Sequence, residues 1–134
     1  MSRVTTMPVM TSAESVSIAI AGAVTVYTKA IKLRFGEYFS LGYKAVSASS
    51  APDIKIELEQ SVKDVLPATE GASDANYVVA ENASAIETSL ITESFKLKAL
   101  SPVASHYCRL KITGAAGNAA DTIVTAFLNM TEDF

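Results

Sequence analysis

The sequence predicts an all-β fold in a single domain, and three observations lead to this prediction. Short segments rich in β-branched and aromatic residues follow one another along most of the chain, at the spacing expected of a sandwich or a barrel. Clusters of Gly, Pro, Asn, Asp and Ser separate these segments. Several segments alternate apolar and polar side chains, as a strand does when one of its faces is buried. The chain has 134 residues, of which 49% are hydrophobic, so it is long enough for one core that needs neither disulfide bonds nor a metal.

The N-terminal residues differ from the rest of the chain. Residues 1–13 are rich in Thr, Ser and Met, contain Pro8 and show no sustained period, so we expect an extended arm. Such an arm is either mobile or ordered by a neighbour. A β-sandwich domain is expected at 14–134, with about eight antiparallel strands. The expected strands lie near 16–20, 24–34, 38–47, 53–60, 76–80, 94–100, 106–113 and 121–129.

The clearest alternation lies at 53–60 and 106–113. In the first segment the residues predicted to point inward are aliphatic: Ile54, Ile56 and Leu58. Those predicted to point outward are charged: Lys55, Glu57 and Glu59. In the second segment the inward residues are Cys108, Leu110 and Ile112, and the outward ones are Arg109 and Lys111. Both segments should therefore have one face in the core and one face in solvent.

The C-terminal segment 122–129 is apolar on both predicted faces. Ile123 and Phe127 lie on one face, and Val124, Ala126 and Leu128 lie on the other. This pattern is typical of a central strand, or of a strand that a partner covers. The run Gly114-Ala115-Ala116-Gly117-Asn118 before it is rich in residues that accept a positive φ, so we expect 106–113 and 121–129 to form a hairpin.

Two stretches do not have the pattern of strands. Residues 63–75 contain Pro67, Gly71 and scattered polar residues, which predicts a long loop. Residues 83–91 leave two interpretations open. Ile86 and Leu90 are four residues apart, which suits one face of a short helix, and an irregular loop fits equally well.

Charge and hydropathy exclude several classes of partner. The formal charge is −3, without a dense cluster of Lys and Arg, which argues against binding of nucleic acid or of an anionic membrane. The apolar run 16–26 is about half as long as a membrane-spanning helix, and it makes a poor signal peptide because Glu14 precedes it and Ser, Thr and Gly dilute it.

No combination of residues predicts an active site. His106 is the single histidine and shares a predicted strand face with Cys108, but that cysteine continues the inward apolar row and is expected to be inert. Glu57 and Glu59 lie side by side on an open face, whereas glycosidase chemistry needs two carboxyls facing each other across a cleft. We therefore expect no catalytic, cofactor-binding or metal-binding residues.

Loop oxygens and aromatic rings also have structural interpretations. The residues with loop oxygens lack calcium-loop spacing and suit turns: Asp74, Asn76, Asn118 and Asp121. Phe39 and Tyr43 share a face with aliphatic residues, which favours the core over a ligand platform.

Some phrases of the sequence resemble a known class of proteins. They are Gly36 to Ala45, Asp53 to Gln60, Ser101-Pro102-Val103, and Tyr107 to Gly114 continued by Asn118 to Thr122. These phrases, within residues 24–130, resemble small virion structural proteins of tailed bacteriophages. The resemblance implies a jelly-roll-like β-sandwich without an active site, made in the host cytoplasm and located on the capsid surface. It also implies a capsid decoration, or cement, protein that binds the major capsid protein, or another component of the head or tail.

Three hypotheses therefore remain from the sequence. The first is the decoration protein, for which we expect a homo-oligomer, a trimer in the first instance, because a repeated weak contact gains affinity through multivalency. Its contact candidates are residues 1–13 and the loop 63–75, since added contacts concentrate in such segments. The second is a ligand- or carbohydrate-binding β-sandwich module. The third is a small hydrolase that uses His106.

Overall fold

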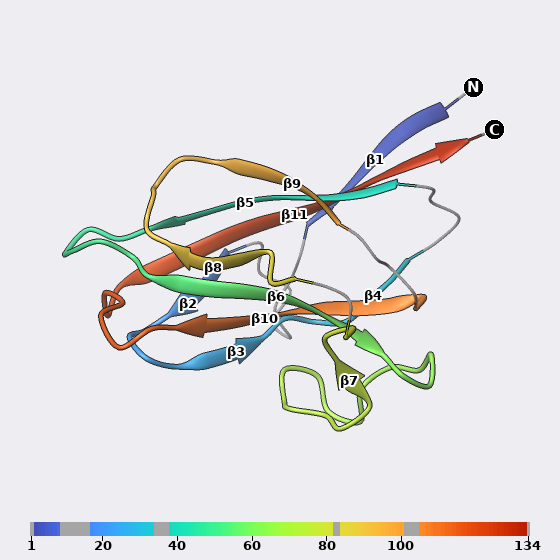
Figure 1. Cartoon of the computed structure of the whole chain (residues 1–134), viewed down its shortest axis with the longest axis horizontal. Helices are drawn as coiled ribbons and strands as arrows, with labels where there is room; N and C mark the ends of the chain where they lie inside the picture. Colours follow the sequence, from blue (N-terminus) through green and yellow to red (C-terminus); the bar gives the residue numbers. More distant parts are fainter. Residues whose placement is uncertain (1, 9–16, 34–37, 82–83, 101–104, 134) are drawn as a thin grey trace.

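The computed structural model describes residues 2–8, 17–33, 38–81, 84–100 and 105–133, and these residues form an all-β fold (Figure 1). No helix occurs among them, and every strand pairing is antiparallel. The strands form two sheets, which we call sheet A and sheet B. None of the described segments contains a helix long and apolar enough to cross a membrane.

Sheet A is built around the last strand of the chain, β11 (Thr122–Asp133). One edge of β11 pairs with β5 (Tyr38–Val46), which pairs in turn with β9 (Lys96–Leu100). The other edge of β11 pairs with β2 (Ser17–Ile20) along its first half and with β1 (Ser2–Pro8) along its second half. The described part of the expected N-terminal arm is therefore a strand ordered by β11, and residues 1 and 9–13 of the arm lie outside the described residues.

Sheet B is built around two long strands, β6 (Ile54–Ser61) and β10 (Tyr107–Gly114). The outer edge of β10 pairs with β3 (Thr25–Tyr27) and β4 (Ile31–Lys32). The outer edge of β6 pairs with β7 (Tyr77–Val78) and β8 (Glu87–Leu90). Each sheet therefore has four strand positions. In sheet A, β1 and β2 share one edge position. In sheet B, β3 and β4 share one edge position, and β7 and β8 share the other.

The core lies between the two sheets, as in a β-sandwich. Sheet A contributes alternate residues such as Leu41 and Val124, and sheet B contributes Ile54, Ile56 and Leu110. Tyr43 is also buried here, and Phe39 packs against the cluster, so the prediction that these rings belong to the core is confirmed. The inward rows predicted for 53–60 and 106–113 are confirmed as well: Ile54, Ile56, Leu58, Cys108, Leu110 and Ile112.

The strand prediction needs two changes. The expected strand 24–34 is interrupted at residues 28–30, where the buried Thr28 hydroxyl accepts a hydrogen bond from the Leu110 amide. The expected helix or loop at 83–91 contains β8 in its described part, residues 84–91. Ile86 and Leu90 are both buried, and a spacing of four residues places two side chains on one face of a strand as well as of a helix. Together with β1, these changes turn about eight expected strands into the eleven described.

The predicted hairpin between 106–113 and 121–129 is wrong. β10 belongs to sheet B and β11 to sheet A, so the connection between them crosses from one sheet to the other. Asn118 holds this crossing: its Nδ2 donates to the carbonyl oxygens of Ile20 and Gly22, and its Oδ1 accepts from the Asp53 amide. The glycines and Asn118 do form a turn, but it joins two layers instead of two neighbours in one sheet.

Candidate functional site

The long loop predicted at 63–75 is confirmed, since residues 62–76 between β6 and β7 contain neither helix nor strand. The loop begins at the end of β6 and returns to the same strand through β7 (Figure 1). It covers part of the outer face of sheet B. This cover changes the environment of two charged residues for which the alternation pattern predicted exposure.

Arg109 is the side chain that the cover buries most. It lies on the outer face of β10 opposite Glu59 of β6, and it is only 1% exposed. Its Nε donates to Glu59 Oε1 at 2.9 Å, and its Nη1 donates to the carbonyl oxygen of Ala72, in the loop, at 2.6 Å. The predicted exposure of Arg109 and Glu59 is therefore wrong, because a segment distant in sequence folds over them.

Two tyrosine rings complete the surroundings of Arg109. The guanidinium carbon lies 4.4 Å from the centre of the Tyr27 ring and 4.8 Å from that of Tyr77. Both distances suit cation–π attraction, which is stronger where water is excluded. Among the described atoms, Nη2 of Arg109 has no hydrogen-bond partner. Burial raises the pKa of Glu59, and the hydrogen bond and charge of Arg109 oppose that rise.

Further hydrogen bonds fix the loop itself. The Tyr77 hydroxyl donates to the Val65 carbonyl at 2.6 Å, and the Val65 amide donates to Ser61 Oγ. Asp74 accepts from the amides of Ala68 and Asn76, which lowers the pKa of its carboxyl. These contacts hold the loop backbone at both ends and in the middle.

The fixed loop presents an apolar ridge to solvent, which we define as Val62, Val65 and Leu66. These side chains are 65%, 46% and 56% exposed. The loop 63–75 was predicted as a contact candidate without these side chains being singled out, although the Val-x-x-Val-Leu pattern inside an otherwise polar loop is a visible signal. A ridge on an ordered backbone loses little conformational entropy when a partner binds it.

His106 does not form a catalytic pair with Cys108. His106 precedes β10, its side chain is 70% exposed, and its Nδ1 lies 2.8 Å from Oδ2 of Asp64 in the loop. Asp64 also accepts from the His106 amide, and these contacts lower its pKa. Cys108 points into the core, where desolvation raises the pKa of its thiol to about 12. The two side chains therefore serve different parts of the structure.

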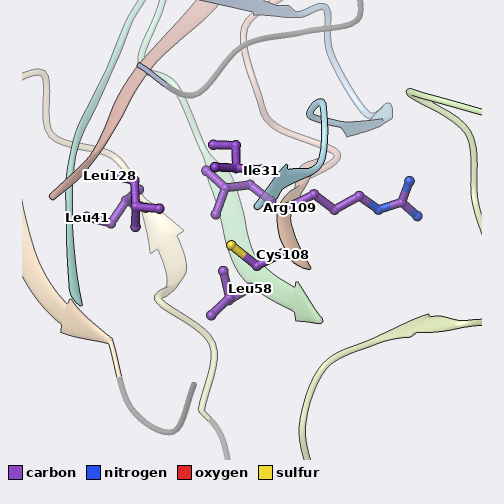
Figure 2. A pocket seen from close by; sticks show the side chains of 7 residues that line it. Ile31, Leu41, Leu58, Cys108, Arg109 and Leu128 are labelled. Carbon is purple, nitrogen blue, oxygen red and sulfur yellow. The ribbon is translucent and has the colours of Figure 1, made fainter. Parts of the chain in front are cut away.

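A recess lies between the sheets, and it is lined by Ile31, Leu41, Leu58, Cys108, Leu110 and Leu128 (Figure 2). Arg109 is also at its wall, but Figure 2 shows its guanidinium group directed away from the aliphatic side chains. The recess is small and apolar, and burial raises the pKa of the Cys108 thiol in its wall to about 12.

The remaining polar candidates take part in local structure. Glu57 stays near the surface with Lys55, 3.8 Å away. Asp121 accepts from the hydroxyls of Ser47 and Ser49, which lowers its pKa to about 2. In the described part of the chain, no three His, Cys, Asp or Glu side chains are grouped so that they could hold a metal ion.

Comparison with known proteins identifies no family for this chain. No family model matches it, and no curated protein matches it significantly.

Proposed function

We propose that this chain is a non-enzymatic virion structural protein, a capsid decoration protein that forms a homo-oligomer and binds the major capsid protein. On this proposal it is made in the host cytoplasm and acts on the capsid surface. The observation that carries the proposal is the order of the strands in the two sheets, together with the phage-like phrases of the sequence.

The strand order supports a jelly roll. Sheet A has the order β1/β2, β11, β5, β9, and sheet B has the order β3/β4, β10, β6, β7/β8. Along the chain, every step between these positions changes sheet except the step from β6 to β7, which pair with each other. Two sheets of four positions, interleaved in this way, are expected of the eight-stranded jelly roll, an architecture common among viral capsid proteins.

The apolar ridge supports a contact role for the loop 62–76. A decoration protein needs surface groups that gain from burial against a partner, and Val62, Val65 and Leu66 supply them. The fixed backbone beneath the ridge favours a preformed contact. A modest contact is sufficient for stable attachment when an oligomer repeats it on a symmetric shell.

Co-sedimentation with empty shells tests this proposal. The shells are assembled from the major capsid protein encoded in the genome that contains this chain's gene. We expect the full chain to sediment with them at a fixed ratio to the capsid subunit. We expect Leu66→Asp to weaken binding about tenfold or more, since a carboxylate in an apolar contact loses its hydration.

A matched variant and a second assay complete the test. Val24→Asp places the same charge on an exposed valine outside the ridge and should bind as the wild type does. Shells that retain no protein at saturating concentration would refute the proposal. Specific binding on a glycan array, without binding to shells, would replace it with the carbohydrate-binding module.

A further inference from the structure

The outer faces of the two sheets differ in chemistry. The outer face of sheet B carries Lys55, Glu57 and Lys111, and the loop 62–76 covers another part of it. The outer face of sheet A carries three exposed large apolar side chains, those of Phe95, Leu97 and Ile123. We define the sheet A face by six residues: Gly42, Lys44, Phe95, Leu97, Ile123 and Phe127. Its one charge belongs to Lys44, whose Nζ lies 4.5 Å from the centre of the Phe95 ring.

Gly42 marks the middle of this face. It pairs with Phe127 on one side and with Leu97 on the other. Its φ is not in the positive range, and a Cβ built there would meet atoms no nearer than 3.9 Å, which is ordinary contact. Neither backbone conformation nor packing within this chain therefore requires glycine. Glycine inside a strand weakens it, and it often marks a place where another molecule approaches closely.

Leu97 stands beside the gap that Gly42 leaves. It is 70% exposed, and Ile123 of β11, on the same outer face, is 42% exposed. A protruding side chain next to a missing one is a self-complementary pattern: Leu97 of one copy can lie over Gly42 of another. The lysines of β9 do not oppose this contact. Lys96 and Lys98 point toward the other sheet, where they bond Glu87 Oε1 and the Ile86 carbonyl.

The area of the sheet A face indicates a weak contact between two copies. Four strand positions about 4.8 Å apart and about seven residues of β5, at about 3.4 Å each, cover roughly 450 Å². A standard stable interface buries about 800 Å² on each partner. One such contact should be weak and dependent on concentration, and it would gain strength when several copies are joined.

We infer that the sheet A face is where two copies of this chain contact each other, with Leu97 of each copy seated over Gly42 of the other. This inference deepens the proposed function, because it rests on the homo-oligomer proposed there. It places contacts between copies on sheet A and leaves the apolar ridge on the opposite side of the molecule for the shell.

Sedimentation equilibrium of the free full-length protein, from about 10 µM to about 1 mM, tests the inference. We expect the wild-type mass to rise with concentration, and Gly42→Glu to raise the dissociation constant about tenfold or more by burying an unpaired charge. The matched control is Thr25→Glu, which adds the same charge at an exposed strand residue of sheet B and should associate as the wild type does.

A second variant keeps the test valid if Gly42→Glu fails to fold. Leu97→Ser alters an exposed side chain and should also weaken association, whereas Ile91→Ser, at a residue of similar exposure outside the face, should not. A wild type that stays monomeric to about 1 mM, or variants of Gly42 and Leu97 that associate as tightly as the wild type, would overturn the inference. Shell binding by the wild type in either case would leave the decoration role standing.

Discussion

Replacement of Arg109 by alanine tests the view that the loop 62–76 depends on a buried ion pair. The variant removes the hydrogen bonds from the guanidinium to Glu59 and to the Ala72 carbonyl. It also removes the cation between the Tyr27 and Tyr77 rings. Glu59 is 6% exposed in the wild type and would stay largely buried unless the loop opens. We therefore expect Arg109→Ala to destabilise the fold and to loosen the loop.

Protonation of Glu59 sets an upper limit on the stability that its unpaired carboxyl can cost in Arg109→Ala. An unpaired buried carboxyl can take up a proton, and at pH 7 this costs about 3.4 kcal/mol for a group whose ordinary pKa is 4.5. Loss of two buried cation–π contacts adds about 1 to 2 kcal/mol. The loss of stability at pH 7 should therefore be at most about 5 kcal/mol, the upper end of the range seen when one partner of a buried pair is removed.

The stability of Arg109→Ala should depend on pH because Glu59 takes up a proton in the folded variant. In the variant, the folded-state pKa of Glu59 lies above its unfolded value, so its folded state binds more protons and the variant loses stability as pH rises. Burial also raises the pKa of Glu59 in the wild type, but Arg109 opposes that rise, so the difference in stability between the two proteins should shrink as pH falls from 7 to 5, by at most about 1.4 kcal/mol per pH unit.

Urea unfolding at pH 5, 6 and 7 measures these differences, and limited proteolysis reports opening of the loop. The double variant Arg109→Met with Glu59→Leu leaves no buried charge, so it should lie within about 2 kcal/mol of the wild type at every pH. Lys111→Ala, two residues along the same face of β10, should change the stability by about 0.5 kcal/mol or less. A loss below about 1 kcal/mol for Arg109→Ala at pH 7, or one independent of pH, would refute the reasoning.

Four further measurements test other parts of the structure. The carboxyl of Asp121 has a pKa of about 2, so it contributes stability above its ordinary pKa and loses that contribution as pH falls from about 4 to about 2; Asp121→Asn should abolish this change in acid unfolding curves. Leu90→Ala should cost about 2 to 5 kcal/mol in urea unfolding, because the side chain is fully buried. The thiol of Cys108 should react with a disulfide reagent only as fast as the protein unfolds, because it is buried out of reach of the reagent and its burial raises its pKa to about 12. Gly114→Ala should destabilise the fold by more than about 1 kcal/mol in the same assay, because its Cβ would overlap the Gly22 carbonyl.

Alternation predicted the long strands because each of them faces the core on one side only. Ile54 and Ile56 point inward as the pattern requires, and the same holds for Leu110 and Ile112. The pattern could not decide where side chains are spaced by four residues, as Ile86 and Leu90 are, because a helix and a strand place both of them on one face. Nor did the pattern predict whether β10 and β11 lie in one sheet. Gly and Asn allow a tight turn, but such a turn can join two adjacent strands of one sheet or two strands of different sheets.

The candidate contact surfaces were predicted only in part. The composition of 63–75 indicated a long loop, but the burial of Arg109 depends on a segment that lies 37 residues away at Ala72. Local pattern contains no information on such a contact. The apolar character of both faces of 122–129 indicated a central strand or a strand covered by a partner; β11 is paired on both edges within sheet A, and Ile123 is exposed on its outer face. The partner of Ile123 in this arrangement stays a prediction.

The position of β11 has a consequence for the order in which the chain folds. β11 pairs with β1, β2 and β5, and Ser2 lies opposite Asp133 at its end. Synthesis proceeds from the N-terminus, so the strands of sheet A wait for their central member, whereas the strands of sheet B all precede β11 and can pair earlier. Pairing across this separation closes a very long loop, which slows folding. Until β11 emerges from the ribosome, the edges of β1, β2 and β5 stay open to other chains, so this interval is where misassembly competes with folding.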